Sequence, residues 1–129
     1  LFKPNFKEFN VGLKEDIKKG DINNLMNYAS AFSKKQNIKN IMITLSEDGV
    51  ILCNENSKTH IPAEVRNISD VSGAGDTVIS TAALAFCKGV SGKDLVIISN
   101  LAGGLVCEEV GVVPINKERL KNEFLKRAK

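Results

Sequence analysis

The segment Asp70–Thr77, with the sequence DVSGAGDT, places small residues and an acid directly before a long apolar run. The first amides of a helix have no partner inside the helix and carry a partial positive charge. Gly73, Ala74 and Gly75 are small enough to let a bulky anion approach such amides closely. This segment, here called the glycine turn, therefore predicts an anion hole at the start of a helix.

Asp76 gives the glycine turn a second chemical possibility. A site that only held phosphate would not place an acid at its edge, because like charges repel. A carboxylate here can instead deprotonate a substrate hydroxyl that attacks a phosphoryl group, whose charge the amides stabilise. The alternative is structural, because acids in the first turn of a helix favour its dipole. The segment lacks both the Gly-Lys-Ser/Thr of a Walker A loop and the GxGxxG spacing of a dinucleotide-binding turn.

Helix caps and apolar periodicity predict the helices and strands around this turn. Asp21, Ser91 and Asn116 are expected N-caps, and Gly89 is expected to end the helix that follows the glycine turn. The order of two helices, three strands and three helices indicates an α/β fold whose sheet is only partly present. Helices are expected at 7–13, 22–36, 77–87, 93–109 and from 117 onward, and strands at 41–45, 50–53 and 59–62.

Two adjacent glycines interrupt the expected helix 93–109. Gly103 and Gly104 each lower helix propensity by about 1 kcal/mol. Such a penalty indicates either tight helix packing or a ligand near the backbone, and the residues alone leave both interpretations open.

Composition argues against several classes of protein. The chain has 18 Lys and Arg against 15 Asp and Glu, a net charge of +3, which is too balanced to indicate nucleic-acid or membrane binding. The longest apolar stretches contain Ser, Asn or Gly and do not make a membrane span, and no signal peptide is visible. Cys53, Cys87 and Cys107 form no CxxC pair, so we expect buried, reduced thiols of a cytoplasmic protein and no zinc site. His60, the single histidine, is expected to be an ordinary strand residue.

The glycine turn closely resembles the D-[TV]-[TS]-G-A-G-D signature of the ribokinase-like, PfkB carbohydrate kinases. Three other segments resemble family elements in the expected order: KPNFKE the N-x-x-E element, ITLSEDG the nucleotide-side T-x-G-x-x-G segment, and SNLAGG the late helix beside the adenine. The resemblance extends from Lys3 to about Leu120 and implies a ribokinase-like fold. Residues 1–129 would form the C-terminal, nucleotide-binding portion of one kinase domain. Since the sequence starts at Leu1 without a methionine, we expect a fragment that lacks the sugar-binding half and the lid.

The resemblance also implies roles at the reaction centre. Asp76 would be the catalytic base, and the anion hole would be formed by Gly73, Ala74 and Gly75 with the Asp76 amide. Asn5 and Glu8 would organise Mg²⁺ through water.

Further implied roles concern the nucleotide and a second cation. Thr44, Ser46, Glu47 and Gly49 would line the nucleotide side, with Ser46 where glycine is more usual, and Asn100 and Gly103 would flank the adenine of ATP. A monovalent cation such as K⁺ would lie near Asp70, Ser72 and Gly111, although Val113 stands where relatives often have a hydroxyl residue.

Within the family, this sequence looks most like the heptose-7-phosphate kinase domain of ADP-heptose synthesis proteins, which make a lipopolysaccharide precursor. The segments that carry this likeness are KPN…E, DVSGAGDTVIS, SNLAGGLVCEEVG and VVPI. The implied enzyme phosphorylates the anomeric hydroxyl of heptose 7-phosphate with ATP and is a cytoplasmic dimer at full length. One alternative is a kinase for fructose phosphate, ribose or a nucleoside. Another is a noncatalytic nucleotide-binding or structural piece, whose exposed strand edges would favour self-association.

Overall fold

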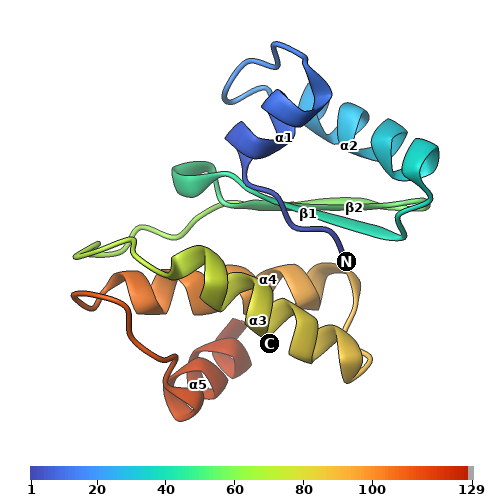
Figure 1. Ribbon diagram of the computed structural model, residues 1–129. Helices are drawn as coiled ribbons and strands as arrows, with labels where there is room; N and C mark the ends of the chain where they lie inside the picture. The colour runs from blue at the N-terminus through green and yellow to red at the C-terminus, as the bar shows by residue number, and fades with distance from the viewer. Residues whose placement is uncertain (128–129) are drawn as a thin grey trace. The chain divides into compact units, whose positions relative to one another are not determined.

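The structure is a computed structural model that describes residues 1–127. The chain divides into two compact units: unit 1 spans Leu1–Pro62, and unit 2 begins at Ala63. Unit 1 contains a small sheet with two helices, and unit 2 contains three helices (Figure 1). Within residues 1–127, none of the helices combines the length and the apolar character that a bilayer crossing needs.

Unit 1 is built on a three-stranded antiparallel sheet with the strand order β1-β2-β3. Ile51 in the central strand lies opposite Ile43 on one side and His60 on the other. All predicted boundaries in this unit are correct to within one residue. The elements are α1 (Phe6–Leu13), α2 (Ile22–Gln36), β1 (Asn40–Thr44), the 3₁₀ turn η1 (Ser46–Asp48), β2 (Val50–Asn54) and β3 (Lys58–Ile61).

Helices α1 and α2 cover one face of this sheet (Figure 1). Because side chains alternate between the two faces of a strand, every second residue of β1 joins the core beneath the helices. The rings of Phe9 and Phe32 meet edge to face there, with centroids 5.7 Å apart. Met42, on the other face of β1, is also buried, which explains the continuous apolar run of this strand. The core includes Phe9, Leu25, Ala29, Ile41, Ile43 and Ile51.

Residues 1–5 run alongside the outer edge of β1 in the parallel direction. Phe2 pairs with Ile41, and Asn5 pairs with Thr44. The amide of Phe2 donates to the carbonyl of Asn40 at 2.9 Å. Since α1 begins directly after Asn5, which pairs with Thr44, it starts at the carboxyl end of β1.

Unit 2 consists of α3 (Ala74–Cys87), α4 (Gly92–Cys107) and α5 (Lys117–Arg127). Helix α3 begins three residues earlier than predicted, inside the glycine turn, and α4 ends two residues earlier than predicted. The predicted ends are otherwise confirmed: Gly89, with a left-handed φ of 85°, follows the C-cap Lys88 of α3, and the Asn116 side chain accepts from the Arg119 amide at 2.9 Å. Ser91 is the N-cap of α4, but its side chain makes no capping hydrogen bond.

The prediction that all three cysteines are buried is wrong for Cys87, which is exposed. Cys53 and Cys107 are buried, and burial raises the pKa of both thiols. Cys87 follows the buried Val78 by about two and a half helical turns and therefore lies on the opposite side of α3. His60 lies in β3, as predicted.

Helices α3 and α4 approach each other closely at Gly103, which is buried. A Cβ atom added to Gly103 would lie 2.6 Å from Cγ2 of Val78 and 3.9 Å from the carbonyl oxygen of Ala74. The missing side chain therefore lets the first turns of α3 lie against the backbone of α4. Tight packing, one of the two interpretations left open by the sequence, accounts for this glycine.

We expect Gly103→Ala to lower the free energy of unfolding by about 1–3 kcal/mol, because the added methyl group overpacks the contact with Val78. Denaturant titration of the full-length protein measures this loss. Val78→Ala makes room for the methyl group, so the double variant should lose less than the sum of the single variants. Strictly additive losses would contradict the close approach.

Candidate active site

The glycine turn forms the N-terminus of α3. Gly73 is the N-cap and has a φ of 75°, a left-handed conformation that favours glycine. The amide of Ala74 donates to the carbonyl of Val71 at 3.3 Å. In the described part of the chain, the amides of Gly75 and Asp76 have no hydrogen-bond acceptor. The Gly73 amide also has no acceptor among these residues, so the amides of Gly73, Gly75 and Asp76 are the donors that the turn can offer to an anion.

Asp76 is the third residue of α3, and its side chain is exposed. Among residues 1–127, no hydrogen bond or ion pair engages its carboxylate. The carboxylate is therefore open to a substrate hydroxyl beside the amides of the glycine turn. The same position also places a negative charge at the positive end of the α3 dipole. The geometry therefore fits both a catalytic base and an acid that only stabilises the helix.

The two carboxylate oxygens of Asp70 accept hydrogen bonds from two different parts of unit 2. One carboxylate oxygen accepts from the Ser72 amide at 2.9 Å and from the Ser72 hydroxyl at 2.7 Å. The other accepts from the Gly111 amide at 2.9 Å. The structure thus brings together the three residues proposed for a monovalent cation. It also shows that the Asp70 carboxylate links the glycine turn to the loop after α4.

The two residues proposed to flank the adenine lie on α4. Asn100 and Gly103 are three residues apart and therefore share one face of the helix. Asn100 is half-buried, and Gly103 lies against the first turn of α3. Packing already accounts for Gly103, and its contact with adenine stays a prediction.

Asn5 and Glu8, proposed to organise Mg²⁺, form the capping box of α1. The Glu8 amide donates to Oδ1 of Asn5 at 2.8 Å, and the Asn5 amide donates to Oε2 of Glu8 at 2.8 Å. This structural role was not predicted from the sequence, although the N-x-x-E spacing is the signal for it. Both residues are exposed at the carboxyl end of β1, where Asn5 is paired with Thr44.

The residues proposed for the nucleotide side follow directly on β1. Thr44 ends the strand, and Ser46 and Glu47 lie in η1. Ser46 has a φ of 55°, so it adopts the left-handed conformation that explains why glycine is more usual here. The Gly49 carbonyl closes the turn by accepting from the Leu45 amide at 2.8 Å.

Two residues that hold this turn were not recognised in the sequence. Nε2 of His60 donates to the carbonyl of Asp48 at 2.7 Å. Nζ of Lys19 donates to the carboxylate of Glu47, and this hydrogen bond lowers the pKa of Glu47. Both contacts join residues far apart in the chain, so no local pattern could have indicated them.

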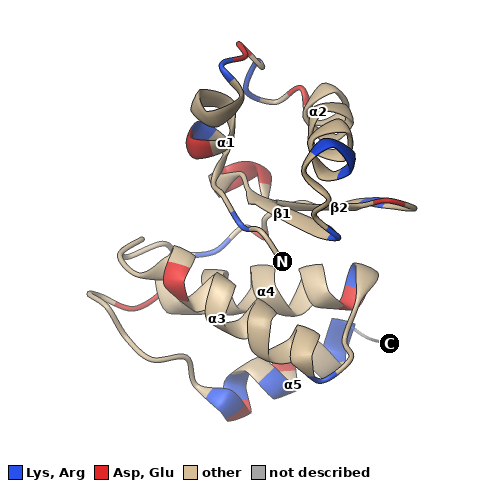
Figure 2. Cartoon of the chain, turned by 45° about the vertical axis from the view of Figure 1, so that its right-hand side comes forward, with Lys and Arg blue, Asp and Glu red and all other residues tan. Residues whose placement is uncertain are grey.

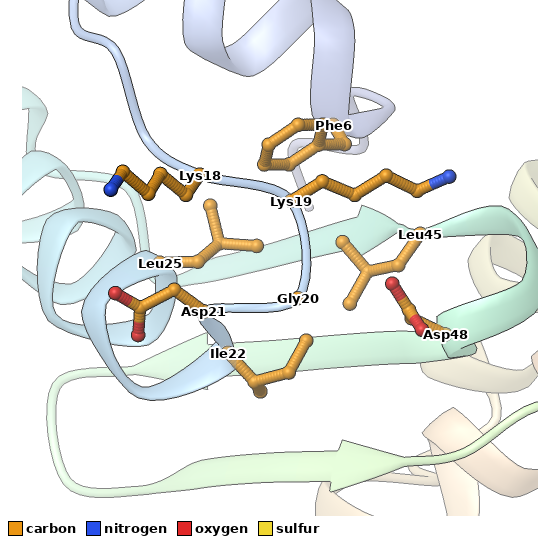
Figure 3. A pocket seen from close by; sticks show the side chains of 9 residues that line it. All are labelled: Phe6, Lys18, Lys19, Gly20, Asp21, Ile22, Leu25, Leu45 and Asp48. Carbon is orange, nitrogen blue, oxygen red and sulfur yellow. The ribbon is translucent and has the colours of Figure 1, made fainter.

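Two hollows of the surface, one in each unit, are lined by residues outside the glycine turn. In unit 1, Lys19, Gly20 and Asp48 help to line a cavity of about 20 Å³, which has room for about one water molecule (Figure 3). The ammonium groups of Lys18 and Lys19 point in opposite directions beside it (Figure 3). A hollow of about 220 Å³ in unit 2 lies between the end of α4 and the start of α5, lined by Val113 and Arg119 among others. Neither hollow includes a residue of the glycine turn, so the turn gives no reason to place the nucleotide in either of them.

The proposed Mg²⁺ ligands fit a cation that is held through water and phosphate. Within the described residues, no group of three or more His, Cys, Asp or Glu side chains could hold a metal ion by itself. Mg²⁺ commonly keeps several waters and uses one or two carboxylates together with substrate phosphates. The exposed carboxylate of Glu8 is a suitable hard oxygen donor for that arrangement.

We expect Ser46→Gly to raise the free energy of unfolding by up to about 1 kcal/mol, because relief of the left-handed strain exceeds the entropy that glycine loses on folding. Ser46→Ala keeps the Cβ atom and is the matched control, expected within about 0.5 kcal/mol of wild type. Thermal and urea unfolding compare the three proteins. A glycine variant less stable than the alanine variant would contradict the expectation.

The pKa of the Asp70 carboxyl group is lowered, first by the Ser72 hydroxyl and then by the amides of Ser72 and Gly111. Ionised Asp70 therefore stabilises the folded state above about pH 3.9, the ordinary pKa of Asp, and this stabilisation disappears as the pH falls through the folded pKa. We expect Asp70→Asn to be less stable than wild type near neutral pH, with the gap closing toward acid pH. Urea unfolding over a pH series measures the gap, and a gap independent of pH would overturn the prediction.

The sequence of this chain is similar to a known family and to curated proteins. Residues 1–119 match the pfkB family of carbohydrate kinases. The chain is 39% identical over 84 residues to the bifunctional protein HldE of Methylobacillus flagellatus. The aligned region covers 65% of this chain and 17% of that protein. It is 32% identical over 110 residues to HldE of Magnetococcus marinus, which covers 84% of this chain and 23% of that protein. The chain thus spans less than a quarter of the length of these two curated relatives.

Solved structures share its fold. Ribokinase from Thermotoga maritima matches 96% of this chain and 41% of its own length, with a TM-score of 0.78 and 25% identity. Phosphofructokinase-2 from Escherichia coli, crystallised in complex with potassium, matches 98% of this chain and 40% of its own length, with a TM-score of 0.89 and 16% identity. The ribokinase-like α/β fold predicted from the sequence is confirmed. With its signature turn at the start of α3 and a family match over residues 1–119, this chain belongs to the pfkB family of carbohydrate kinases.

Proposed function

We propose that the chain is the nucleotide-binding and catalytic part of a kinase that transfers the γ-phosphoryl group of ATP to a sugar hydroxyl. The observation that supports this most directly is the glycine turn. There, the amides of Gly75 and Asp76 have no acceptor within the described residues, and they lie beside the exposed Asp76 carboxylate. An anion site with a base at its edge suits phosphoryl transfer better than simple phosphate binding.

In the proposed reaction, the carboxylate of Asp76 accepts the proton of the sugar hydroxyl. The hydroxyl oxygen forms a bond to the γ-phosphorus as the bond from that phosphorus to the bridging oxygen breaks, and ADP leaves. The amides of Gly75 and Asp76 stabilise the negative charge on the transferring group, and the positive end of the α3 dipole adds to this effect.

The nucleotide and the cations are assigned to residues at the ends of elements. Thr44, Ser46, Glu47 and Gly49 would line the nucleotide side, and Asn100 and Gly103 the adenine. Asn5 and Glu8 would hold Mg²⁺ through water, and this cation supplies neutralisation of the ATP phosphates. Asp70, Ser72 and Gly111 would take part in a K⁺ site, which the potassium complex of phosphofructokinase-2 supports.

The substrate proposed is heptose 7-phosphate, phosphorylated at its anomeric hydroxyl for the synthesis of lipopolysaccharide precursors. Support comes from the segments that resemble heptose kinases and from the HldE relatives at 39% and 32% identity. The full-length enzyme would be a cytoplasmic homodimer, which light scattering can check. Another sugar is the second candidate, because ribokinase and phosphofructokinase-2 share the fold.

We expect Asp76→Asn to lower sugar-dependent ADP release by about 10²–10⁴-fold in the full-length protein, because the amide cannot accept the hydroxyl proton. Asp94→Asn is the matched control, since Asp94 is also an exposed acid in the first turn of a helix, here α4. Its turnover should stay within about twofold of wild type. Equal turnover of the Asp76 variant and wild type would contradict the proposed base.

A panel of acceptors separates the two candidate substrates. With Mg²⁺ and K⁺ present, heptose 7-phosphate should support the highest kcat/KM when compared with fructose phosphates, ribose and adenosine. Preference for another acceptor would overturn the heptose assignment and leave the kinase proposal in place. Turnover on none of them would contradict the proposed function.

A further inference from the structure

Arg66 is the best-anchored side chain of the irregular segment that leads into the glycine turn. Only 10% of its side chain is exposed. Its Nη1 donates to Glu108 at 2.6 Å, and its Nη2 donates to Glu64 at 2.7 Å and to Glu123 at 2.9 Å. Burial opposes the charge, yet the carboxylates of Glu123 and Glu108 raise the pKa of Arg66.

The backbone of α4 is shaped to receive this side chain. A Cβ atom added to Gly104 would lie 3.0 Å from Nε of Arg66 and 3.1 Å from its Cδ. The arginine stem therefore lies directly on the helix at Gly104, and Glu108 meets its guanidinium about one turn further on. This contact explains the second of the two adjacent glycines, which the sequence left open.

The same end of α4 also holds the backbone that follows Arg66. The amides of Ser69 and Asp70 both donate to the carbonyl of Cys107, at 2.8 and 3.2 Å. Apolar side chains do not anchor this stretch: Val65 is fully exposed, and Ile68 is 54% exposed. The segment is thus fastened to the end of α4 by the ion pair of Arg66 with Glu108 and by polar contacts of the backbone. It is also tied to α5 by the ion pairs of Arg66 with Glu123 and of Arg127 with Glu64.

We propose that Arg66 is a positioning residue of the kinase reaction. It holds residues 66–73 on the C-terminal end of α4 and so sets the place of the Gly75 and Asp76 amides and of the Asp76 carboxylate. This inference rests on the function proposed above, but the position of the segment can be measured without any substrate.

A purely structural role for Arg66 would be to hold α5 through Glu123. Arg119 provides the matched control, because it also pairs with Glu108 and Glu123 yet makes no ion pair with the segment before the glycine turn. Figure 2 shows that Lys and Arg gather along α5, whereas most of α3 and α4 is without charge. Loss of Arg119 therefore weakens the α5 contacts and leaves the anchor of the segment in place.

The test compares Arg66→Met and Arg119→Met in the full-length protein by amide hydrogen exchange without substrate. Ser69, Asp70 and Gly111 are the reporter amides, since each has an assigned acceptor. We expect Arg66→Met to exchange these amides about tenfold faster than wild type, and Arg119→Met to stay within about twofold. Equal exchange in the two variants, or wild-type exchange in Arg66→Met, would overturn the proposal.

Kinetics give the second readout. In Arg66→Met, kcat for sugar phosphorylation should fall by about tenfold or more, because a small displacement of the reacting groups slows transfer, while Arg119→Met keeps its kcat. If Arg66→Met does not fold, Arg66→Lys decides: it keeps the charge without the fork, so exchange about threefold faster is expected and wild-type exchange contradicts the role. Absence of turnover in wild type would contradict the proposed function alone, since the exchange result still decides on Arg66.

Discussion

The hydrogen bond between the Asp70 carboxylate and the Gly111 amide joins the loop before α3 to the loop after α4, across 41 residues of the chain. The other Asp70 oxygen holds Ser72 inside the glycine turn. One carboxylate therefore fixes both the entry to α3 and the exit from α4. Without such a link, a turn of small, flexible residues would have no defined direction for its amides.

Glycines make this arrangement possible in different ways. Gly73 needs its left-handed backbone, and a Cβ atom there would also lie 3.0 Å from the Val112 side chain. Gly103 brings α3 against α4, and Gly104 admits the stem of Arg66. The two glycines lower the helix propensity of α4. This loss is offset by the contacts of Gly103 with α3 and of Gly104 with Arg66, which place the start of α3.

Much of this could be predicted from the sequence, because the signals were local. The strands of unit 1 and helix α2 have clear apolar patterns and caps, and the glycine turn is a specific motif. The early start of α3 was missed because Gly and Ala in the turn look like loop residues. Helix α4 ends early where the Cys107 carbonyl accepts from Ser69 and Asp70, a contact between distant segments. Two of the three partners of Arg66, Glu108 and Glu123, lie 42 and 57 residues away, so no periodicity could have indicated them.

The candidate residues divide between the two units, and each unit brings its own members together. Asn5, Thr44 and the η1 turn share the carboxyl end of β1, whereas Asp70 and Asp76 border the start of α3. Asn5 and Glu8 also show that one pair of residues can cap a helix and present an exposed carboxylate at the same place.

We propose that the glycine turn binds the phosphoryl group that is transferred. The most direct measurement is ¹⁵N NMR of the full-length protein during titration with a non-hydrolysable ATP analogue, Mg²⁺ and the sugar. We expect the largest amide shifts at Gly75 and Asp76, with little change at Lys93 and Asp94 in the first turn of α4. Saturating binding that leaves the amides of Gly75 and Asp76 unchanged would contradict it.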